Sequence, residues 1–215
     1  MFVLKSLIKK IDRSLVLKSV ACSLVFMITL SISGFDGKCE TVRENVLRLH
    51  VLANSDSEED QTLKLKVRDA LLTVSNEIFE NCATENEAAE AARESKDLLL
   101  WVAQNTVREN GYSYLVSIDI AETWFETRDY DKFSLPAGNY EALRVVIGEG
   151  KGKNWWCVMF PAVCVPAASE KTNGFKNALT SETAEIVEQP ERYKARFKVV
   201  EIFEKTRQKM SDWFF

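Results

Sequence analysis

The sequence has few of the residues from which catalytic and metal sites are usually built. It holds one histidine, His50, among 215 residues, and it lacks the GxSxG, HExxH and CxxC motifs. A single histidine with scattered cysteines does not make the usual ligand set of a zinc site. The sequence therefore predicts no metal and no cofactor, and no motif in it indicates an enzyme.

The sequence also lacks an excess of basic residues. Lys and Arg number 28 against 32 Asp and Glu, which gives a net charge of -4. Residues 1–33 contain five of the basic residues and one acidic residue, so the rest of the chain is more acidic still. Because nucleic-acid binding requires a basic face that neutralises phosphates, we expect no nucleic-acid partner.

The apolar run at residues 19–33 is shorter than the roughly 20 residues that span a bilayer. A basic stretch precedes it, and Ser31 and Ser33 occupy the third and first positions before a possible cleavage site at Gly34. This pattern predicts a secretory signal peptide at residues 1–33, with an uncleaved membrane anchor as the alternative. Residues 34–215 would then form one domain outside the cytosol, with membrane contact only through the N-terminal segment.

Cysteine is scarce in the predicted mature domain, where Cys39, Cys82, Cys157 and Cys164 permit three pairings. Cys157 and Cys164 bracket the turn CVMFPAVC, and a bridge between them would close a short loop. The pair is our disulfide candidate. Two unpaired buried thiols are the alternative.

Apolar periodicity predicts alternating groups of strands and helices. We expect strands at residues 43–53, 112–130, 141–148, 155–161 and 192–200. We expect helices at residues 57–82, 85–110 and 181–188 and from about residue 201 to the end. The third and fourth strands read as a β-hairpin around the glycine-rich turn GEGKGKN. The order predicts an α+β fold: a mainly antiparallel sheet of about five strands with two long helices packed on one face.

The stretch NSDSEED at residues 54–60 is best explained as a strand-to-helix turn. Ser57 is the predicted N-cap, acidic residues fill the first turn, and Asp60 stands where it could complete a reciprocal cap. A calcium loop would need a central glycine, which this stretch lacks.

Two further patterns admit a chemical reading beside a structural one. Gly148, Gly150 and Gly152 do not open a helix, so a strand-connecting loop is the better reading than a phosphate site. Asp119 and Glu141 could face each other as a hydrolase pair, although solvated sheet residues are commoner.

Three stretches together resemble stage II sporulation protein R of endospore-forming bacteria. They are LRLHVLANSDSEEDQTLKLKVRDALL, GNYEALRVVIGEGKGKNWWCVMFPAVC and RFKVVEIFEK, which occur in the family's order after a similar N-terminal signal. The resemblance covers most of residues 43–205. Pro161-Ala162 stands where the family usually has a doubled proline, and the terminal KMSDWFF lies outside the similar part.

The resemblance implies a function that the residues alone do not reveal. Members of this family are made in the forespore and exported into the space between the forespore and mother-cell membranes. There they activate a membrane-embedded aspartic protease, which processes pro-sigma factor E. The resemblance thus implies a signalling protein without catalysis of its own.

Two surfaces are our candidates for binding that protease. One is the polar strand rim and turn at Arg48, His50, Asn54 and Asp56, and the other is the tryptophan hairpin at Arg144, Trp155 and Trp156. Helix capping and core packing are the structural alternatives for the two sets. A cell-envelope hydrolase that uses the carboxylate pair or His50, or an envelope adhesion module, would be the competing functions.

Overall fold

The computed structural model describes residues 13–130, 133–161 and 179–214. The chain divides into two compact units, Met1–Lys38 and Cys39–Phe215. Helix α2 (Arg13–Arg43) begins in the first unit, continues through the predicted cleavage site before Gly34 and ends in the second. Within the described residues, no helix combines the length and the apolar character needed to cross a membrane. The signal segment at residues 1–33 stays a prediction.

The second unit is built on a four-stranded sheet with the order β2-β5-β1-β6. Its strands are β1 (Leu47–Leu52), β2 (Val116–Phe125), β5 (Gly138–Ile147) and β6 (Asn154–Phe160). Strand β1 runs parallel to β5 and antiparallel to β6, and β2 runs antiparallel to β5. Strands β3 (Arg128–Asp129) and β4 (Ser134–Leu135) form a separate two-stranded sheet.

The α+β class is confirmed, but the sheet is mixed and has four strands. The predicted hairpin of residues 141–161 is wrong because β1 lies between β5 and β6. Strand β1 is buried from Leu47 to Val51 on both of its faces, as a central strand must be. A parallel pair between β1 and β5 requires a long crossover, which local sequence patterns do not reveal.

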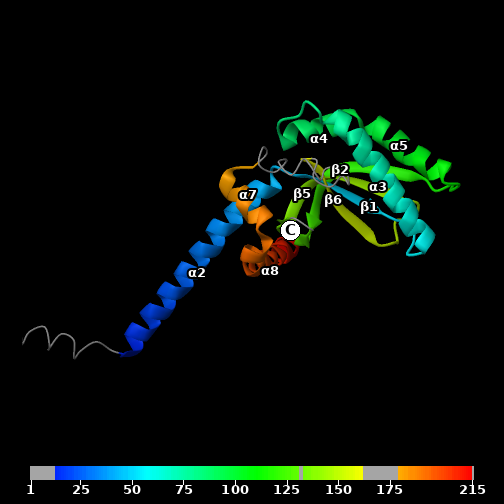
Figure 1. The fold of residues 1–215 in the computed structure, drawn as a ribbon. Coiled ribbons are helices and arrows are strands. Elements are labelled where there is room, and N and C mark those ends of the chain that lie inside the picture. The colour runs from blue at the N-terminus through cyan, green and yellow to red at the C-terminus, as the bar shows by residue number, and fades with distance from the viewer. Residues whose placement is uncertain (1–12, 131–132, 162–178, 215) are drawn as a thin grey trace, which may run out of the picture. The chain divides into compact units, whose positions relative to one another are not determined.

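One face of the sheet is covered by α3 (Glu58–Ile78), α4 (Glu85–Glu94) and α5 (Lys96–Glu109), as Figure 1 shows. Side chains repeating at helical spacing, such as Leu63, Val67 and Leu71, join Leu49 and Leu143 of the sheet in one apolar core. The predicted single helix at residues 85–110 is wrong, because the chain breaks at Ser95 into α4 and α5.

The other face carries a second apolar cluster and is bordered by α7 (Ser181–Glu188), which was predicted with the same bounds. The cluster is formed by Val42, Val46, Phe125, Phe133, Leu135, Tyr140, Ala142, Val158, Leu179, Ala184 and Val187. Thr180 caps α7, since its hydroxyl accepts a hydrogen bond from the backbone N–H of Thr183.

Helix α8 (Pro190–Phe214) replaces the predicted strand at residues 192–200. That segment alternates polar and apolar residues, but Phe197, Val200, Glu201 and Glu204 are the buried ones. Their spacing of three and four residues is that of one helix face, so the period-two interpretation was wrong. Pro190 suits the first helical position, where its missing N–H costs no hydrogen bond.

Candidate partner-binding site

Four side chains form a row across all four strands on the sheet face opposite α3–α5. Asp119 of β2 pairs in register with Arg144 of β5, Arg144 pairs with His50 of β1, and His50 pairs with Trp156 of β6. We call these four residues the cross-strand row. Three of them were partner-binding candidates from separate parts of the sequence, and the fold brings them side by side.

His50 is the buried centre of the row, with 6% of its surface exposed. Its ring stacks on Trp156 with centroids 3.9 Å apart and meets Phe125 edge-on. Asn154 is the polar side chain that interacts with the imidazole, but neither ring nitrogen makes a hydrogen bond of normal geometry with a described residue. Burial lowers the pKa of His50, the cations of Arg144 and Arg48 lower it further, and only Asn154 acts in the opposite direction. The imidazole is therefore held neutral and works here as an aromatic ring.

Arg48 is wholly buried rather than part of an exposed polar rim. Its Nε donates to the Cys157 carbonyl at 3.0 Å and its Nη2 donates to the Tyr130 hydroxyl at 2.8 Å. The guanidinium lies over the rings of Phe125 and Tyr140, at 4.1 and 4.9 Å from their centroids. In this structure Arg48 cannot reach a partner directly, and its position is that of an interior residue stabilised by aromatic faces.

The row becomes exposed toward β2. Arg144 and Asp119 are both exposed, and Asp119 lies 3.7 Å from the ammonium of Lys96. The next register row contains Ser117, Val146 and Leu52, of which the two apolar side chains are half-buried. This corner of the sheet face is thus open to a partner and mixes charge with accessible apolar area.

Trp155 lies on the opposite face from its neighbour Trp156. It packs against the core under α3–α5, and the guanidinium of Arg68 lies 4.4 Å from its ring centroid. Adjacent strand residues point to opposite faces, so the two tryptophans do not form one surface. Trp155 belongs with the core, whereas Trp156 belongs with the cross-strand row.

Asn54 joins the end of β1 to the start of α3 and to the glycine-rich loop. Its Oδ1 accepts from the backbone N–H of Glu149 at 3.1 Å, and its Nδ2 donates to Asp60 at 2.9 Å. Asp56 accepts from the backbone N–H of Lys153 at 2.7 Å. We call residues 54–60 together with residues 148–153 the loop junction. The exposed side chain of Asp56 is the member of the candidate set that a partner could reach there.

The spaced glycines allow the two loops of this junction to touch. A Cβ on Gly148 would come within 2.3 Å of Asn54 Oδ1, and the φ of Gly148 is +60°. A Cβ on Gly152 would lie 2.1 Å from the Ser55 carbonyl oxygen. These glycines therefore serve close packing of one loop on another, which supports the structural reading over a phosphate site.

Asp60 is the buried hub of the junction. Ser57 caps α3 as predicted, since its hydroxyl accepts from the Asp60 N–H at 3.2 Å. The reciprocal half of the cap is wrong: the Asp60 carboxylate accepts from Asn54 and from the Ser55 hydroxyl, the latter at 2.6 Å. Burial acts to raise the pKa of Asp60, but hydrogen bonds from Ser55, Asn54 and Tyr114 outweigh it and lower the pKa.

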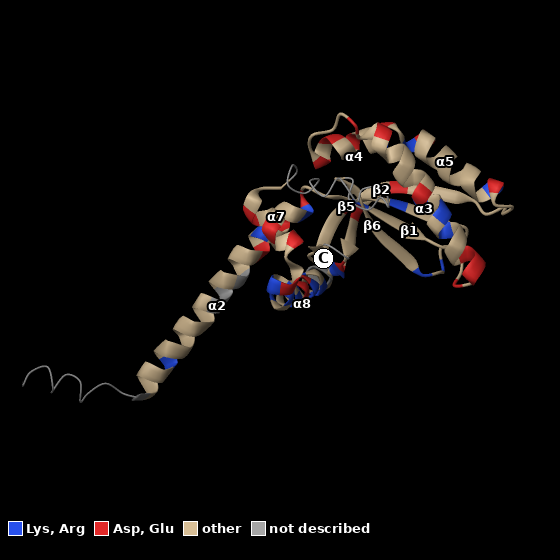
Figure 2. Cartoon of the chain, viewed as in Figure 1, with Lys and Arg blue, Asp and Glu red and all other residues tan. Residues whose placement is uncertain are grey.

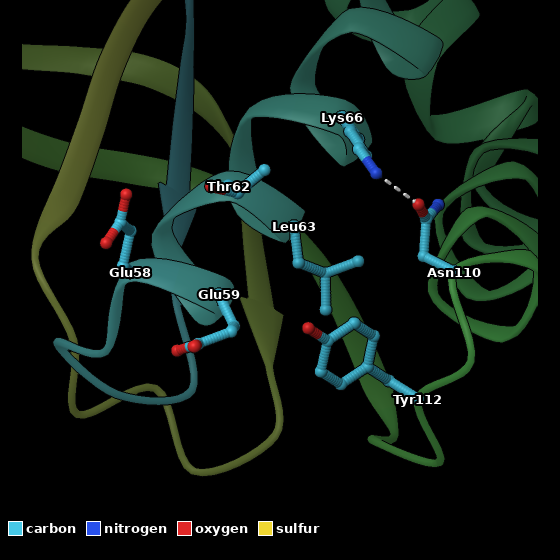
Figure 3. A pocket seen from close by; sticks show the side chains of 7 residues that line it. All are labelled: Glu58, Glu59, Thr62, Leu63, Lys66, Asn110 and Tyr112. Atoms are coloured by element: carbon cyan, nitrogen blue, oxygen red, sulfur yellow. Dashed lines mark hydrogen bonds between the residues drawn. The ribbon is translucent and has the colours of Figure 1, made fainter.

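An open pocket of about 340 Å³ lies beside the junction and was not anticipated from the sequence. Its lining residues are Glu58, Glu59, Thr62, Leu63, Lys66, Asn110 and Tyr112 (Figure 3). Lys66 donates to Asn110 Oδ1 at 2.6 Å, which ties α3 to the end of α5. Acidic residues gather at the start of α3 (Figure 2), so the pocket is suited to a polar or cationic group. In the sequence, only the acidic first turn of α3 could have indicated this pocket.

The carboxylate pair of the hydrolase hypothesis is not assembled. Asp119 is in register with Arg144, whereas Glu141 is in register with Glu122, an odd number of positions away along the strands. The two carboxylates therefore point to opposite sheet faces. Glu141 instead contacts Arg93 of α4. His50, the other catalytic candidate, is buried in its aromatic stack.

The disulfide candidate is left untested. Cys157 is buried on β6, whereas Cys164 lies outside the described residues. The bridge between them stays a prediction.

Comparison with known proteins identifies the group to which this arrangement belongs. Stage II sporulation protein R of Bacillus subtilis (strain 168) is 35% identical over 123 residues, which cover 57% of this chain and 55% of that relative. The match thus spans about half of the relative's length. No solved structure matches significantly. The family model described as stage II sporulation protein R matches residues 43–170, which include β1, the loop junction and the cross-strand row. The chain belongs to the stage II sporulation protein R family.

Proposed function

We propose that this chain is an exported signalling protein of endospore formation that activates a membrane-embedded aspartic protease. The protease would then process pro-sigma factor E. Membership of the family supports a role in sporulation. The family name does not specify a chemical reaction. The basic and apolar pattern of residues 1–33 supports export from the forespore into the space between the two membranes.

The open corner of the sheet face is the surface that best suits receptor binding. Arg144 and Asp119 are exposed there, half-buried apolar side chains flank them, and the stack of His50 on Trp156 lies beside Arg144 in the same row. A rigid scaffold with exposed groups lowers the entropy lost on binding. An activator of this kind must bind the active form of its receptor more tightly than the resting form.

Co-expression in a non-sporulating host tests this proposal. The full chain, the candidate protease and its pro-sigma substrate would be produced together, and processing would be scored with and without residues 1–33. We expect processing that depends on the N-terminal segment. Efficient activation by a chain that stays in the producing compartment, or substrate turnover by the purified chain alone, would contradict the proposal.

Charge reversal then tests the surface. Arg144→Glu should reduce processing by at least tenfold at an unchanged level of exported protein, since a receptor group that binds this cation would then face a carboxylate. Arg108→Glu makes the same change at an exposed position of α5 on the other side of the sheet and serves as the matched control. Equal effects of the two variants would show that the sheet face is not the contact.

A further inference from the structure

Helix α8 presents a row of apolar side chains to solvent. Its buried residues are Phe197, Val200, Glu201 and Glu204, which occupy one side of the helix. On the opposite side, Val199, Ile202, Phe203 and Met210 are each between 42% and 58% exposed. We call these four residues the α8 stripe. Their spacing of three, four and seven residues gives one face about 17 Å long, with Thr206 between Phe203 and Met210.

Basic residues flank the α8 stripe on both sides. At 100° per residue, one border holds Lys198, Lys205 and Lys209, and the other holds Arg196 and Arg207. Arg192 lies in line with Met210 on the stripe itself and pairs with Glu185. Figure 2 shows both basic and acidic residues on α8. Glu191 is exposed at the first turn and pairs with Lys194. Glu201 and Glu204 turn to the buried side, where Glu201 pairs with Lys198 and Lys205, and Glu204 pairs with Arg207.

We propose that the outer face of α8 docks on the surface of an anionic lipid bilayer. An interfacial helix buries an apolar face at the level of the headgroups while lysine and arginine side chains extend to the phosphates. The α8 stripe supplies the apolar face and its two borders supply the cations. This contact would be additional to the N-terminal segment, which the sequence predicts as the only membrane-contacting part.

Charge complementarity selects lipid over a second copy of this chain. Two α8 helices packed stripe to stripe would bring like-charged borders against each other, which costs free energy. The chain as a whole has a net charge of -4, so cations are concentrated around this stripe although the protein is acidic overall. The helix lies outside residues 43–170, so the proposal does not rest on the match to the family model.

Hydrogen–deuterium exchange of the full chain with lipid vesicles tests the proposal site by site. Phosphatidylglycerol vesicles and phosphatidylcholine vesicles would be compared, and peptides from α8 would be read separately from those of α2. We expect slower exchange in α8 with phosphatidylglycerol only, and a loss of that protection at high salt. The separate reading keeps any binding through α2 from being mistaken for binding through α8.

Matched variants assign the effect to the stripe. Ile202→Ser with Phe203→Ser should lower the affinity of α8 for the anionic vesicles on the order of tenfold or more, because both apolar contacts are lost. Leu98→Ser with Trp101→Ser removes similarly exposed apolar side chains from α5 and should leave α8 protection unchanged. Lys209→Gln should weaken binding by about fivefold, the usual effect of one basic residue near an anionic surface.

Several outcomes would overturn the proposal. Equal protection of α8 by phosphatidylcholine, or no protection by either vesicle, excludes an anionic lipid surface. Protection of α8 that grows with protein concentration in the absence of vesicles, together with a dimer in sedimentation equilibrium, assigns the stripe to a second copy. Loss of α8 protection in the Leu98→Ser and Trp101→Ser control would mean that the effect is not specific to the stripe.

Discussion

The face of the sheet under α3, α4 and α5 is mostly apolar, with Glu122 and Glu141 as a polar register pair, whereas the opposite face changes from buried aromatic residues to exposed polar ones. The first face is held by aliphatic side chains in one continuous core. The second buries Arg48 and His50 among Phe125, Tyr140 and Trp156 and leaves Arg144 and Asp119 at the surface. The contrast indicates that one face stabilises the fold and the other presents groups to a partner. Substitutions on the helix-covered face should therefore change stability through lost apolar volume. Substitutions at the titratable residues of the opposite face should change how stability depends on pH.

The largest effect is expected on the helix-covered face. Leu71→Ala should lower the free energy of unfolding by about 2–5 kcal/mol, because Leu71 is fully buried and its removal leaves a cavity. Urea denaturation followed by tryptophan fluorescence measures the change, which should be the same at pH 8 and pH 5.5. Leu115→Ala alters a leucine that is 78% exposed and should change stability by less than about 0.5 kcal/mol. Equal losses in the two variants would contradict the division between the faces.

A smaller effect is expected at the loop junction that joins the sheet to α3. Asp60→Asn should cost about 2 kcal/mol at pH 7, because a buried carboxylate that accepts several hydrogen bonds is lost. The folded-state pKa of Asp60 lies below its ordinary value of 3.8. Its contribution is therefore complete above that value and is lost as the pH falls through the lower folded-state pKa.

The difference between wild type and Asp60→Asn should accordingly shrink below about pH 4. Glu59→Gln changes an exposed carboxylate in the same first turn and is the matched control. A gap between wild type and Asp60→Asn that persists unchanged down to pH 2 would mean that the charge of Asp60 is not what stabilises the junction.

The helix cap should have a smaller effect still. Ser57→Ala should cost about 1 kcal/mol, because the Asp60 N–H loses the hydroxyl that accepts its hydrogen bond. Ser57→Asp supplies another acceptor at the same place and should recover most of the loss in urea denaturation. If Ser57→Asp is no more stable than Ser57→Ala, the hydroxyl stabilises the turn by some other contact.

Local signals in the sequence explain which elements could be predicted. Ser57 and the acids after it identified the start of α3, and α7 was found with its bounds. Long-range packing explains most of the misses. The parallel pairing of β1 with β5 depends on a crossover, and the residues of α8 satisfy both a period of two and a helical repeat.

In the candidate site, too, local features could be predicted and long-range packing could not. Alternation along β1 placed Arg48 and His50 on the correct face, but it could not show that this face is covered there. Covering depends on Phe125 of β2, Tyr140 of β5 and Trp156 of β6, three strands that come far later in the chain. The cross-strand row emerges only when the strand order is known.

The smallest effect at neutral pH, and the one most specific to the second face, belongs to His50. His50→Phe keeps an aromatic ring against Trp156 and removes two buried nitrogens that make no hydrogen bond of normal geometry, so stability at pH 7.5 should change by less than about 1 kcal/mol. Because the folded-state pKa lies below the ordinary value of 6.5, the unfolded chain binds a proton that the folded chain does not. Wild type should therefore lose stability as the pH falls from 6.5, and the variant should not share this loss.

Since His50 is the only histidine, the variant removes every histidine contribution at once. The slope of unfolding free energy between pH 7.5 and pH 5.5 should fall by up to about 1.4 kcal/mol per pH unit relative to wild type. Leu71→Ala provides the comparison, since its stability is lower but its slope should equal that of wild type. An unchanged slope in His50→Phe would mean that His50 binds a proton in the folded state as readily as in the unfolded chain. The row would then be a less rigid support for Arg144 than its packing indicates.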